Sequence, residues 1–316
     1  MAMGIAAPEA PQPAATSAGL PPEAGVESPW RRFVSEFAES GLALAGLVLL
    51  VALVLVAIAA PYISPQNPYD LAQLDVLDSR LAPGEHSSAT GKPYWLGTDD
   101  QGRDMLSGIF YGLRISLAVG VASTAIALAI GLALGLAAAY FGGWVDGVIM
   151  RIADIQLSFP AILIALILLA ILGQGVGKII AALVTIQWAY YARTVRATAL
   201  VERQKEYVEA AKVLALSQPR IVFRHLLPNC LPPLIVVATV QIAHAISLEA
   251  TLSFLGLGLP ITEPSLGLLI ANGFQYLLSG KYWISFYPGL ALLLTIVSIN
   301  LVADQLRDVL NPRLRK

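Results

Sequence analysis

The sequence contains long apolar stretches without a single charged residue, and these limit the possible folds more than any other feature. Leu42–Ala60 and Ile115–Val145 are both free of charge. A hydrocarbon core about 30 Å thick needs roughly 20 residues of helix, so each stretch can cross a bilayer. Because lipid cannot satisfy backbone N–H and C=O groups, such stretches must be helical. The sequence therefore predicts an all-α, polytopic membrane protein.

Four further apolar runs raise the prediction to about six transmembrane helices. They are Ile155–Gly177, Ile179–Ala192, Cys230–Leu248 and Tyr282–Ala303. The second run is short, and it is counted because Lys178 and Arg193 at its ends can extend to the two membrane interfaces. The composition agrees, since 57% of the residues are hydrophobic and 13% are charged, whereas soluble domains carry about 25% charged residues.

Charge and cysteine usage exclude several classes of protein. The 20 basic residues are balanced by 21 acidic ones, so no net charge attracts nucleic acid. The single cysteine, Cys230, excludes an intrachain disulfide framework and a metal cluster built from cysteine. The three histidines (His86, His225 and His244) lie far apart, and no Ser/His/Asp or His/Glu spacing supports catalysis. We therefore predict neither a metal site nor catalytic residues.

The distribution of basic residues predicts how the chain crosses the membrane. With the N-terminus in the cytosol, fourteen Lys and Arg residues fall inside and six outside, as the positive-inside rule expects. Both termini are then cytosolic. The expected divisions are a disordered tail at 1–29, a segment with the first helix at 30–63, an external loop at 64–114, a transmembrane core at 115–305 with a cytosolic loop at 193–228, and a C-terminal tail at 306–316.

The cytosolic loop 193–228 carries a helical pattern. The residues at helical spacing, which are expected to share one face, are Tyr207, Ala211, Leu214 and Ala215. Ser217 can cap a second short helix that runs through Phe223 and stops before Pro228. Two short helices of this kind suit docking into a groove on a partner. The alternative is an amphipathic helix that lies on lipid headgroups.

The loop also resembles a known motif. Glu209-Ala210-Ala211, the small residue Ala215 and the pair Leu227-Pro228 are similar to the EAA loop of ABC importer permeases. In that family the loop is a coupling helix that fits a cleft in a cytosolic ATPase subunit, and Gly normally stands where this chain has Ala215. The coupling residues that the resemblance implies are Glu206, Tyr207, Glu209, Ala210, Ala211, Lys212, Leu214, Ala215, Ser217, Arg220, His225, Leu227 and Pro228.

Other segments narrow the resemblance to permeases for dipeptides, oligopeptides and nickel. In chain order they are Leu96–Asp104, Tyr111–Leu117, Met150–Asp154, Phe159-Pro160, Glu249–Gly258 and Pro264–Gly267. Leu266 stands where that family usually has Trp, and Gly108 stands where Arg is common. The resemblance covers about residues 30–316 and is to the second, C-type permease of such systems, which implies a type I ABC importer fold.

The resemblance implies a permease subunit of an ATP-driven importer in the bacterial plasma (inner) membrane. It implies as partners a B-type permease that completes a heterodimer, two cytosolic ATPase subunits, an extracytoplasmic substrate-binding protein and membrane lipid. The sequence has no GxxxxGK[ST] phosphate loop, so ATP and Mg are expected on the ATPase subunits and no cofactor or enzymatic activity on this chain. Peptides are the expected ligand, and nickel or another small ligand is the alternative. A nucleotide-independent secondary transporter would need internal repeats or paired half-helices, which are not evident.

Several polar and small residues leave alternatives open. Acidic residues of the external loop either contact a basic rim on the binding protein or belong to a solvated loop, and they are Asp70, Asp75, Asp78, Asp99 and Asp100. Glu249 interrupts an apolar run, where it either lines the ligand path or forms a hydrogen bond between helices. Gly131 and Gly135 form a GxxxG pair that predicts close helix packing, either within the subunit or between subunits.

Overall fold

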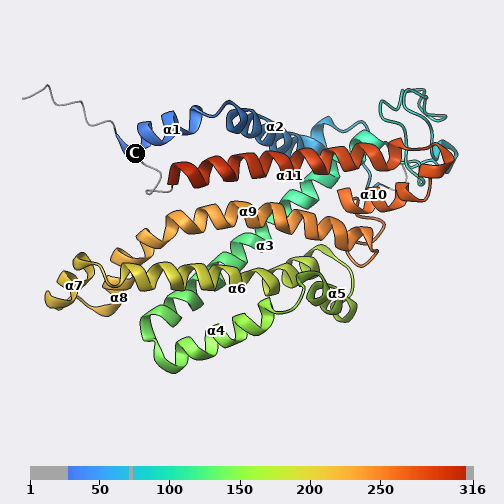
Figure 1. Ribbon diagram of the computed structural model, residues 1–316. Helices are drawn as coiled ribbons and strands as arrows, with labels where there is room; N and C mark the ends of the chain where they lie inside the picture. Colours follow the sequence, from blue (N-terminus) through green and yellow to red (C-terminus); the bar gives the residue numbers. More distant parts are fainter. Residues whose placement is uncertain (1–27, 71–73, 311–316) are drawn as a thin grey trace, which may run out of the picture.

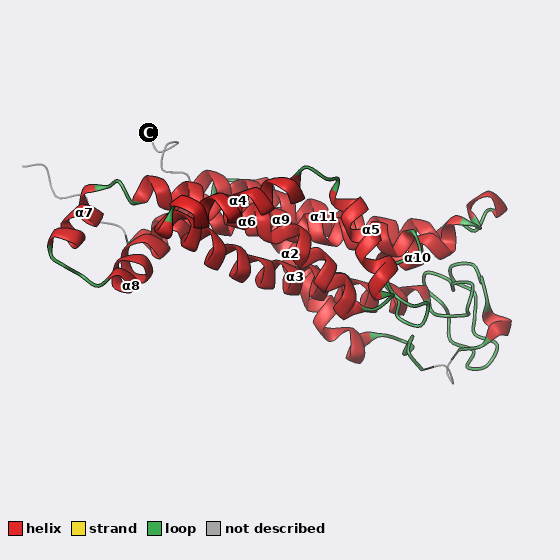
Figure 2. Cartoon of the chain, turned by 90° about the horizontal axis from the view of Figure 1, so that it is seen from below, coloured by secondary structure: helices red, strands yellow, loops and turns green. Residues whose placement is uncertain are grey.

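The computed structural model describes residues 28–70 and 74–310, so the predicted tails lie outside it except for their inner ends. Across these described residues the chain forms helices and no strand, which confirms the predicted all-α class. Most of the long helices run along one axis, and α3 (Met105–Phe141) crosses them obliquely (Figure 1). Two short helices, α7 (Glu206–Val213) and α8 (Gln218–Ile221), lie at one end, and the loops of residues 64–104 lie at the other (Figure 2).

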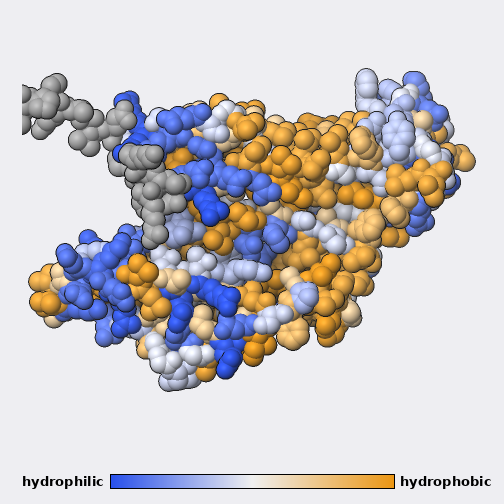
Figure 3. Space-filling model, in the orientation of Figure 1, coloured by the Kyte–Doolittle hydropathy of each residue, from blue (hydrophilic) through white to orange (hydrophobic). Residues whose placement is uncertain are grey.

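The body of the molecule is built from long helices. They are α2 (Gly41–Ile63), α3 (Met105–Phe141), α6 (Val176–Glu202), α9 (Leu227–Phe254) and α11 (Trp283–Leu310). By length and composition, α2, α3, α11 and the continuous segment from α8 through α9 can each cross a membrane. Hydrophobic residues dominate the half of the surface nearer the external loops, and hydrophilic residues gather around α7 and α8 (Figure 3).

Shorter helices complete the described fold. They are α1 (Pro29–Ala38), α4 (Gly143–Leu157), α5 (Ala161–Leu172), α10 (Leu266–Phe274) and the single turns Val76–Asp78 and Leu277–Ser279. Taken together, α4 and α5 are apolar enough to form a fifth span. Adding α6, which is 27 residues long but less apolar, makes the structure compatible with the six predicted spans.

The third predicted span is not one straight helix, so this part of the prediction is wrong. The run Ile155–Gly177 begins within the last turn of α4 and continues through α5, and the two helices meet at 91°. Pro160 lies at the corner and precedes α5. Because proline has no N–H and disfavours helical conformation in the residue before it, α4 cannot continue through this point.

Two other helices end at residues that the sequence does not predict. α3 ends at Phe141, short of Val145, because Gly142 adopts a φ of 62° that leaves the helical region. α6 continues to Glu202, well past the expected end at Ala192. The non-helical part of the cytosolic loop is therefore shorter than 193–228.

The GxxxG pair packs α3 against α6 within the subunit. A Cβ atom at Gly131 would lie 2.6 Å from the backbone oxygen of Trp188, and one at Gly135 would lie 2.6 Å from the backbone oxygen of Ala192. Only hydrogen fits in these positions, so the two helix backbones can approach closely. This contact accounts for both glycines without a second subunit.

Replacing Gly131 with Val is expected to destabilise the fold, because the new methyl groups would collide with the backbone of α6. Overpacking of a close interface costs about 1–3 kcal/mol, and more where backbone must move. The thermal unfolding midpoint of the purified protein in detergent should fall. Gly147→Ala on α4 is the matched control, since its Cβ would meet no atom within 4 Å. An equal midpoint for Gly131→Val and the unmodified chain would contradict the packing argument.

Glu249 belongs to a hydrogen-bonded cluster between helices. Its carboxylate accepts a hydrogen bond of 2.8 Å from the hydroxyl of Ser116 on α3 and another of 2.8 Å from the hydroxyl of Ser253 on α9. The side chain is fully buried. The sequence leaves two alternatives for Glu249, a residue of the ligand path or a hydrogen bond between helices. The contacts in the structure are those of the second alternative.

Candidate functional site

The loop between α6 and α9 folds as a small helical lobe with a core of its own. Its helices are α7, α8 and a five-residue π-helix, Val222–Leu226, which leads into α9. The residues buried at the centre of the lobe are Val208, Ala211, Ile221 and Leu226. This packing fixes α7 and α8 relative to each other, so the lobe can act as one rigid projection.

Tyr207 fastens the lobe to the long helices. Its hydroxyl donates a hydrogen bond of 2.6 Å to Glu202 at the end of α6 and accepts one of 3.1 Å from Asn229 on α9. Its ring stacks on His225, with ring centres 6.5 Å apart. Burial raises the pKa of Tyr207 to about 12, and the hydrogen bond to Glu202 acts in the same direction. These contacts connect the lobe to α6 and α9, and the His225 ring packs against the Tyr207 ring.

Ala215 adopts the left-handed conformation in which the family usually places glycine, with a φ of 51°. Its N–H donates to the oxygen of Lys212 at 2.9 Å, and the N–H of Leu216 donates to the oxygen of Ala211 at 3.1 Å. These two bonds form a Schellman motif, which closes a helix and reverses the chain. The turn required by the motif is thus made, and alanine bears the conformational cost that glycine would avoid.

Replacing Ala215 with Gly is expected to stabilise the lobe by about 1 kcal/mol, because glycine adopts this φ without a steric penalty. Hydrogen exchange of peptides covering residues 206–226 should slow in Ala215→Gly. Ala210→Gly is the control, because Ala210 lies inside α7 and glycine there should speed exchange. Faster exchange in Ala215→Gly than in the unmodified chain would contradict the assigned role of this turn.

The outer surface of the lobe exposes three large apolar residues that we call the apolar tip. Val213 is 85% exposed, Leu214 73% and Phe223 65%. The same lobe also exposes charged residues, namely Glu206, Glu209, Lys212, Arg220 and Arg224. Exposed apolar residues together with charged ones are suited to a protein interface. The predicted coupling set includes Leu214 but omits Val213 and Phe223, whose exposure the sequence does not reveal because other apolar residues of the same stretch, such as Ile221, are buried.

Two predictions about the local structure of the loop are wrong. Ala211 and Leu214 do not share a face, because α7 ends at Val213 and Ala211 is buried while Leu214 is exposed. The second helix does not stop before Pro228 but continues into α9. The π-helix allows this, since the N–H of Leu227 bonds to the oxygen of Val222 and proline is tolerated in the first turn of α9. Ser217 precedes α8 as predicted, without a side-chain capping bond.

All thirteen residues of the predicted coupling set divide into two groups by exposure. Exposed to solvent are Glu206, Tyr207, Glu209, Ala210, Lys212, Leu214, Ala215, Ser217, Arg220 and Pro228. Turned partly or wholly inward are Ala211, His225 and Leu227. Most of the set is therefore exposed on the lobe, while Ala211 belongs to its core.

Two of the five acidic residues proposed for the external contact are structural, so the prediction is corrected for them. Asp99 is buried and accepts a hydrogen bond of 2.8 Å from the guanidinium of Arg103. Asp78 is buried and accepts bonds from the backbone of Ser88 and the hydroxyl of Tyr94. Burial alone would raise the pKa of Asp78, but these hydrogen bonds outweigh it and lower the pKa. Neither carboxylate can contact another protein directly.

The other three acidic residues lie nearer the surface. Asp70, Asp75 and Asp100 are half-buried. Asp75 accepts a bond of 2.9 Å from the backbone of Leu77. Apolar residues of this region are exposed as well, namely Val76, Leu77 and Trp95. Composition does not reveal this surface, because it depends on how a loop folds.

Together, the apolar helices and the lobe define a polytopic membrane protein with a small helical lobe at one end. The chain belongs to the family of binding-protein-dependent transport system inner membrane components, which matches residues 127–316. A second family match, the N-terminal TM domain of oligopeptide transport permease C, covers residues 28–83. The predicted family is confirmed, and the chain is a membrane permease of a transport system that depends on a binding protein.

Relatives match nearly the whole chain. The dipeptide transport system permease protein DppC of Escherichia coli (strain K12) is 40% identical over 289 residues, which is 92% of this chain and 95% of that protein. DppC of Alkalihalophilus pseudofirmus is 35% identical over 288 residues, 91% of each chain. The glutathione transport system permease protein GsiD of Pectobacterium atrosepticum is 35% identical over 290 residues, 92% of this chain and 93% of that protein.

A solved structure supports the fold. A chain of the inward-facing MetNI methionine ABC transporter matches with a TM-score of 0.53 at 22% identity, covering 66% of this chain and 98% of its own length. The match includes nearly the whole of the solved chain and about two thirds of this one. This likeness confirms the predicted permease fold.

Proposed function

We propose that this chain is one of two permease subunits of an ATP-driven importer that moves peptides from an external binding protein into the cytosol. The observation that carries the proposal is the 40% identity to a dipeptide permease over 92% of the chain. The fastened lobe supports it, because an importer needs a rigid contact through which an energy source acts on transmembrane helices. Peptide is preferred to nickel because the similar proteins carry peptide names.

The lobe is proposed to dock on a cytosolic ATPase subunit. The apolar tip would enter a cleft on that subunit, and the exposed charges of the lobe would set its orientation. ATP and Mg would be held by two such subunits, since this chain has no phosphate loop. When the ATPases close, Tyr207 would transmit the displacement to α6 and α9, and access to the path would alternate between the two sides.

The remaining partners follow from the same proposal. A second, B-type permease would complete a heterodimer in the bacterial inner membrane, and both termini of this chain would face the cytosol. The binding protein would dock on the external region. There the three half-buried carboxylates and the exposed Val76, Leu77 and Trp95 form the accessible surface.

Affinity purification in mild detergent tests the proposal directly. The tagged chain should recover a second permease and ATPase subunits. The purified complex in proteoliposomes should import dipeptides only with ATP and a loaded binding protein, and dipeptides should be preferred to nickel chelates in a panel of ligands. A homo-oligomer that transports without nucleotide would overturn the proposal.

A further inference from the structure

One face of α9 carries more polar side chains than is usual for a transmembrane helix. Gln241, His244, Ser247 and Thr251 recur at intervals of three or four residues, so they share one face of the helix. We call them the polar stripe. His244 and Ser247 are exposed in the subunit, and Thr251 is partly exposed. Gln241 lies about 20 Å from the end of α9 at Phe254, at 1.5 Å per residue, which places it near mid-membrane.

A second helix shows what a lipid-facing surface looks like in this protein. The exposed residues of α2 are apolar, and they include Leu42, Val48, Val51, Leu55 and Ile58. Polar side chains that face hydrocarbon lose their hydrogen bonds with water, so they are rare on such surfaces. Thr251 satisfies its hydroxyl within α9, because it donates a hydrogen bond of 2.8 Å to the backbone oxygen of Ser247. The exposed imidazole of His244 makes no hydrogen bond within the described residues, so the polar stripe is poorly suited to face lipid.

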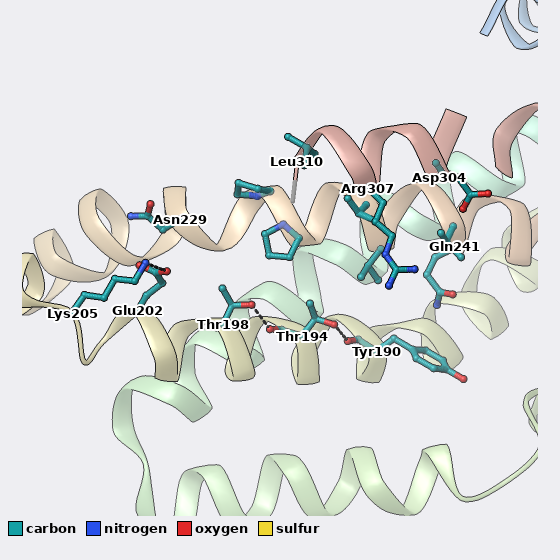
Figure 4. Close-up of a pocket in the computed structure, with 16 residues that line it drawn as sticks. Tyr190, Thr194, Thr198, Glu202, Lys205, Asn229, Gln241, Asp304, Arg307 and Leu310 are labelled. Atoms are coloured by element: carbon teal, nitrogen blue, oxygen red, sulfur yellow. Dashed lines mark hydrogen bonds and ion pairs between the residues drawn. The ribbon is translucent and has the colours of Figure 1, made fainter. Parts of the chain in front are cut away.

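At its cytosolic end the polar stripe opens into a groove of about 990 Å³ between α6, α9 and α11. Gln241 belongs to both the stripe and the groove (Figure 4). The polar part of the groove wall includes Thr194 and Thr198 of α6, Asp304 and Arg307 of α11, and, toward the lobe, the ion pair of Glu202 with Lys205 and the amide of Asn229. The volume is in the upper part of the range for small-molecule sites, about 300–1,000 Å³.

Two polar groups of the groove have no partner in the part of the chain that the structure describes. The amide of Gln241 makes no hydrogen bond there, although the side chain is largely buried. The guanidinium of Arg307 makes no ion pair there and points from α11 toward the groove (Figure 4). On the same face of the molecule, hydrophilic residues extend from the lobe toward mid-molecule between hydrophobic surfaces (Figure 3). Such groups are suited to water or to a passing ligand.

From these features we infer that the polar stripe and the groove form this subunit's wall of the translocation path. The inference rests on the proposed function and adds the ligand-facing residues. At membrane depth the stripe is neutral and offers an amide, an imidazole and two hydroxyls, which match the hydrogen-bonding groups of a peptide backbone. No carboxylate belongs to it, since Glu249 points to Ser116 instead. A path for a bare metal cation would be expected to present carboxylates.

A carboxylate and a guanidinium line the groove near the cytosolic end of α11. Asp304 and Arg307 are both exposed and lie three residues apart on that helix. A small peptide with free ends carries an ammonium and a carboxylate, and this pair can contact both. Each contact is solvated and weak, which lets the ligand leave.

Cysteine labelling of the whole complex in nanodiscs tests the inference. His244→Cys and Ser247→Cys should react with a charged, membrane-impermeant methanethiosulfonate at least tenfold faster than Val48→Cys, although Val48 is 63% exposed in the subunit. The unmodified chain provides the blank, because its only cysteine, Cys230, is buried. Labelling of His244→Cys or Ser247→Cys should also reduce import of a radiolabelled dipeptide at least tenfold, and treatment of Val48→Cys should not.

Labelling of both stripe variants at the rate of Val48→Cys would overturn the inference, because lipid or a partner helix would then cover the stripe. Recovery of the second permease and the ATPases with the same variants is measured in parallel. If these partners are recovered and labelling fails, only the inference is wrong. If the unmodified chain recovers no such partners, the proposed function itself is wrong. Ser247→Cys changes a single atom, so its folding serves as the reference for the bulkier replacement at His244.

Discussion

Replacing Phe223 with Asp is expected to reduce ATP-driven import at least tenfold while the complex still hydrolyses ATP. Phe223 is an exposed member of the apolar tip, outside the core of the lobe, so the substitution leaves the fold of the lobe intact. In the proposed cleft, however, a carboxylate would lose its water without gaining a partner. That penalty is several kcal/mol, and a tenfold change corresponds to about 1.4 kcal/mol.

The measurement is dipeptide uptake and phosphate release by the same proteoliposomes. Phe223→Leu is the matched control, because it keeps an apolar side chain at the tip and should retain most of the uptake. Val201→Asp tests whether any exposed cytosolic apolar residue would give the same result, since Val201 lies on α6 outside the tip. Normal uptake by Phe223→Asp would show that the apolar tip does not carry the contact with the ATPase.

The membrane helices were predictable because each is an apolar run whose length matches a bilayer. Their ends were less predictable, since they depend on contacts between distant segments. α6 can continue past Arg196 because its guanidinium pairs with Asp146 of α4, and its end at Glu202 is held by Lys205 and Tyr207. Pro160 marks the break between α4 and α5, but the 91° angle arises because both helices pack against α6, and hydropathy cannot show that.

The motif located the functional loop but not its orientation. Ile221 and Leu226 from the second half of the loop cover Val208 and Ala211, so these become core while Val213 and Phe223 become surface. A single helical wheel cannot show this, because the covering residues come from another element. The acidic external residues have a similar explanation. Their number suggested a solvated loop or a contact surface, yet local hydrogen bonds draw two of them inside.

Replacing Asp99 with Ala is expected to destabilise the external region more than any other single change there. The carboxylate accepts bonds from both the guanidinium and the backbone N–H of Arg103, at 2.8 and 2.9 Å. Arg103 in turn donates a bond of 3.1 Å to the backbone oxygen of Ile261, in the loop between α9 and α10. The pair thus joins the external loops to the membrane bundle. Removing one partner of a buried ion pair costs about 3–5 kcal/mol, because the other charge stays buried without compensation.

The double variant separates this charge effect from a loss of packing. In Asp99→Ala with Arg103→Met, no uncompensated charge remains, and methionine fills part of the space of the arginine stem. Limited proteolysis of residues 64–104 should therefore be fastest in Asp99→Ala and intermediate in the double variant, and the thermal unfolding midpoint should follow the same order. If the double variant were cleaved as fast as Asp99→Ala, the loss of stability would come from the missing hydrogen bonds between Asp99 and the backbone. The unpaired, buried guanidinium of Arg103 would then not be its cause. If Asp99→Ala resisted proteolysis like the unmodified chain, the pair would not be what holds the external loops on the bundle.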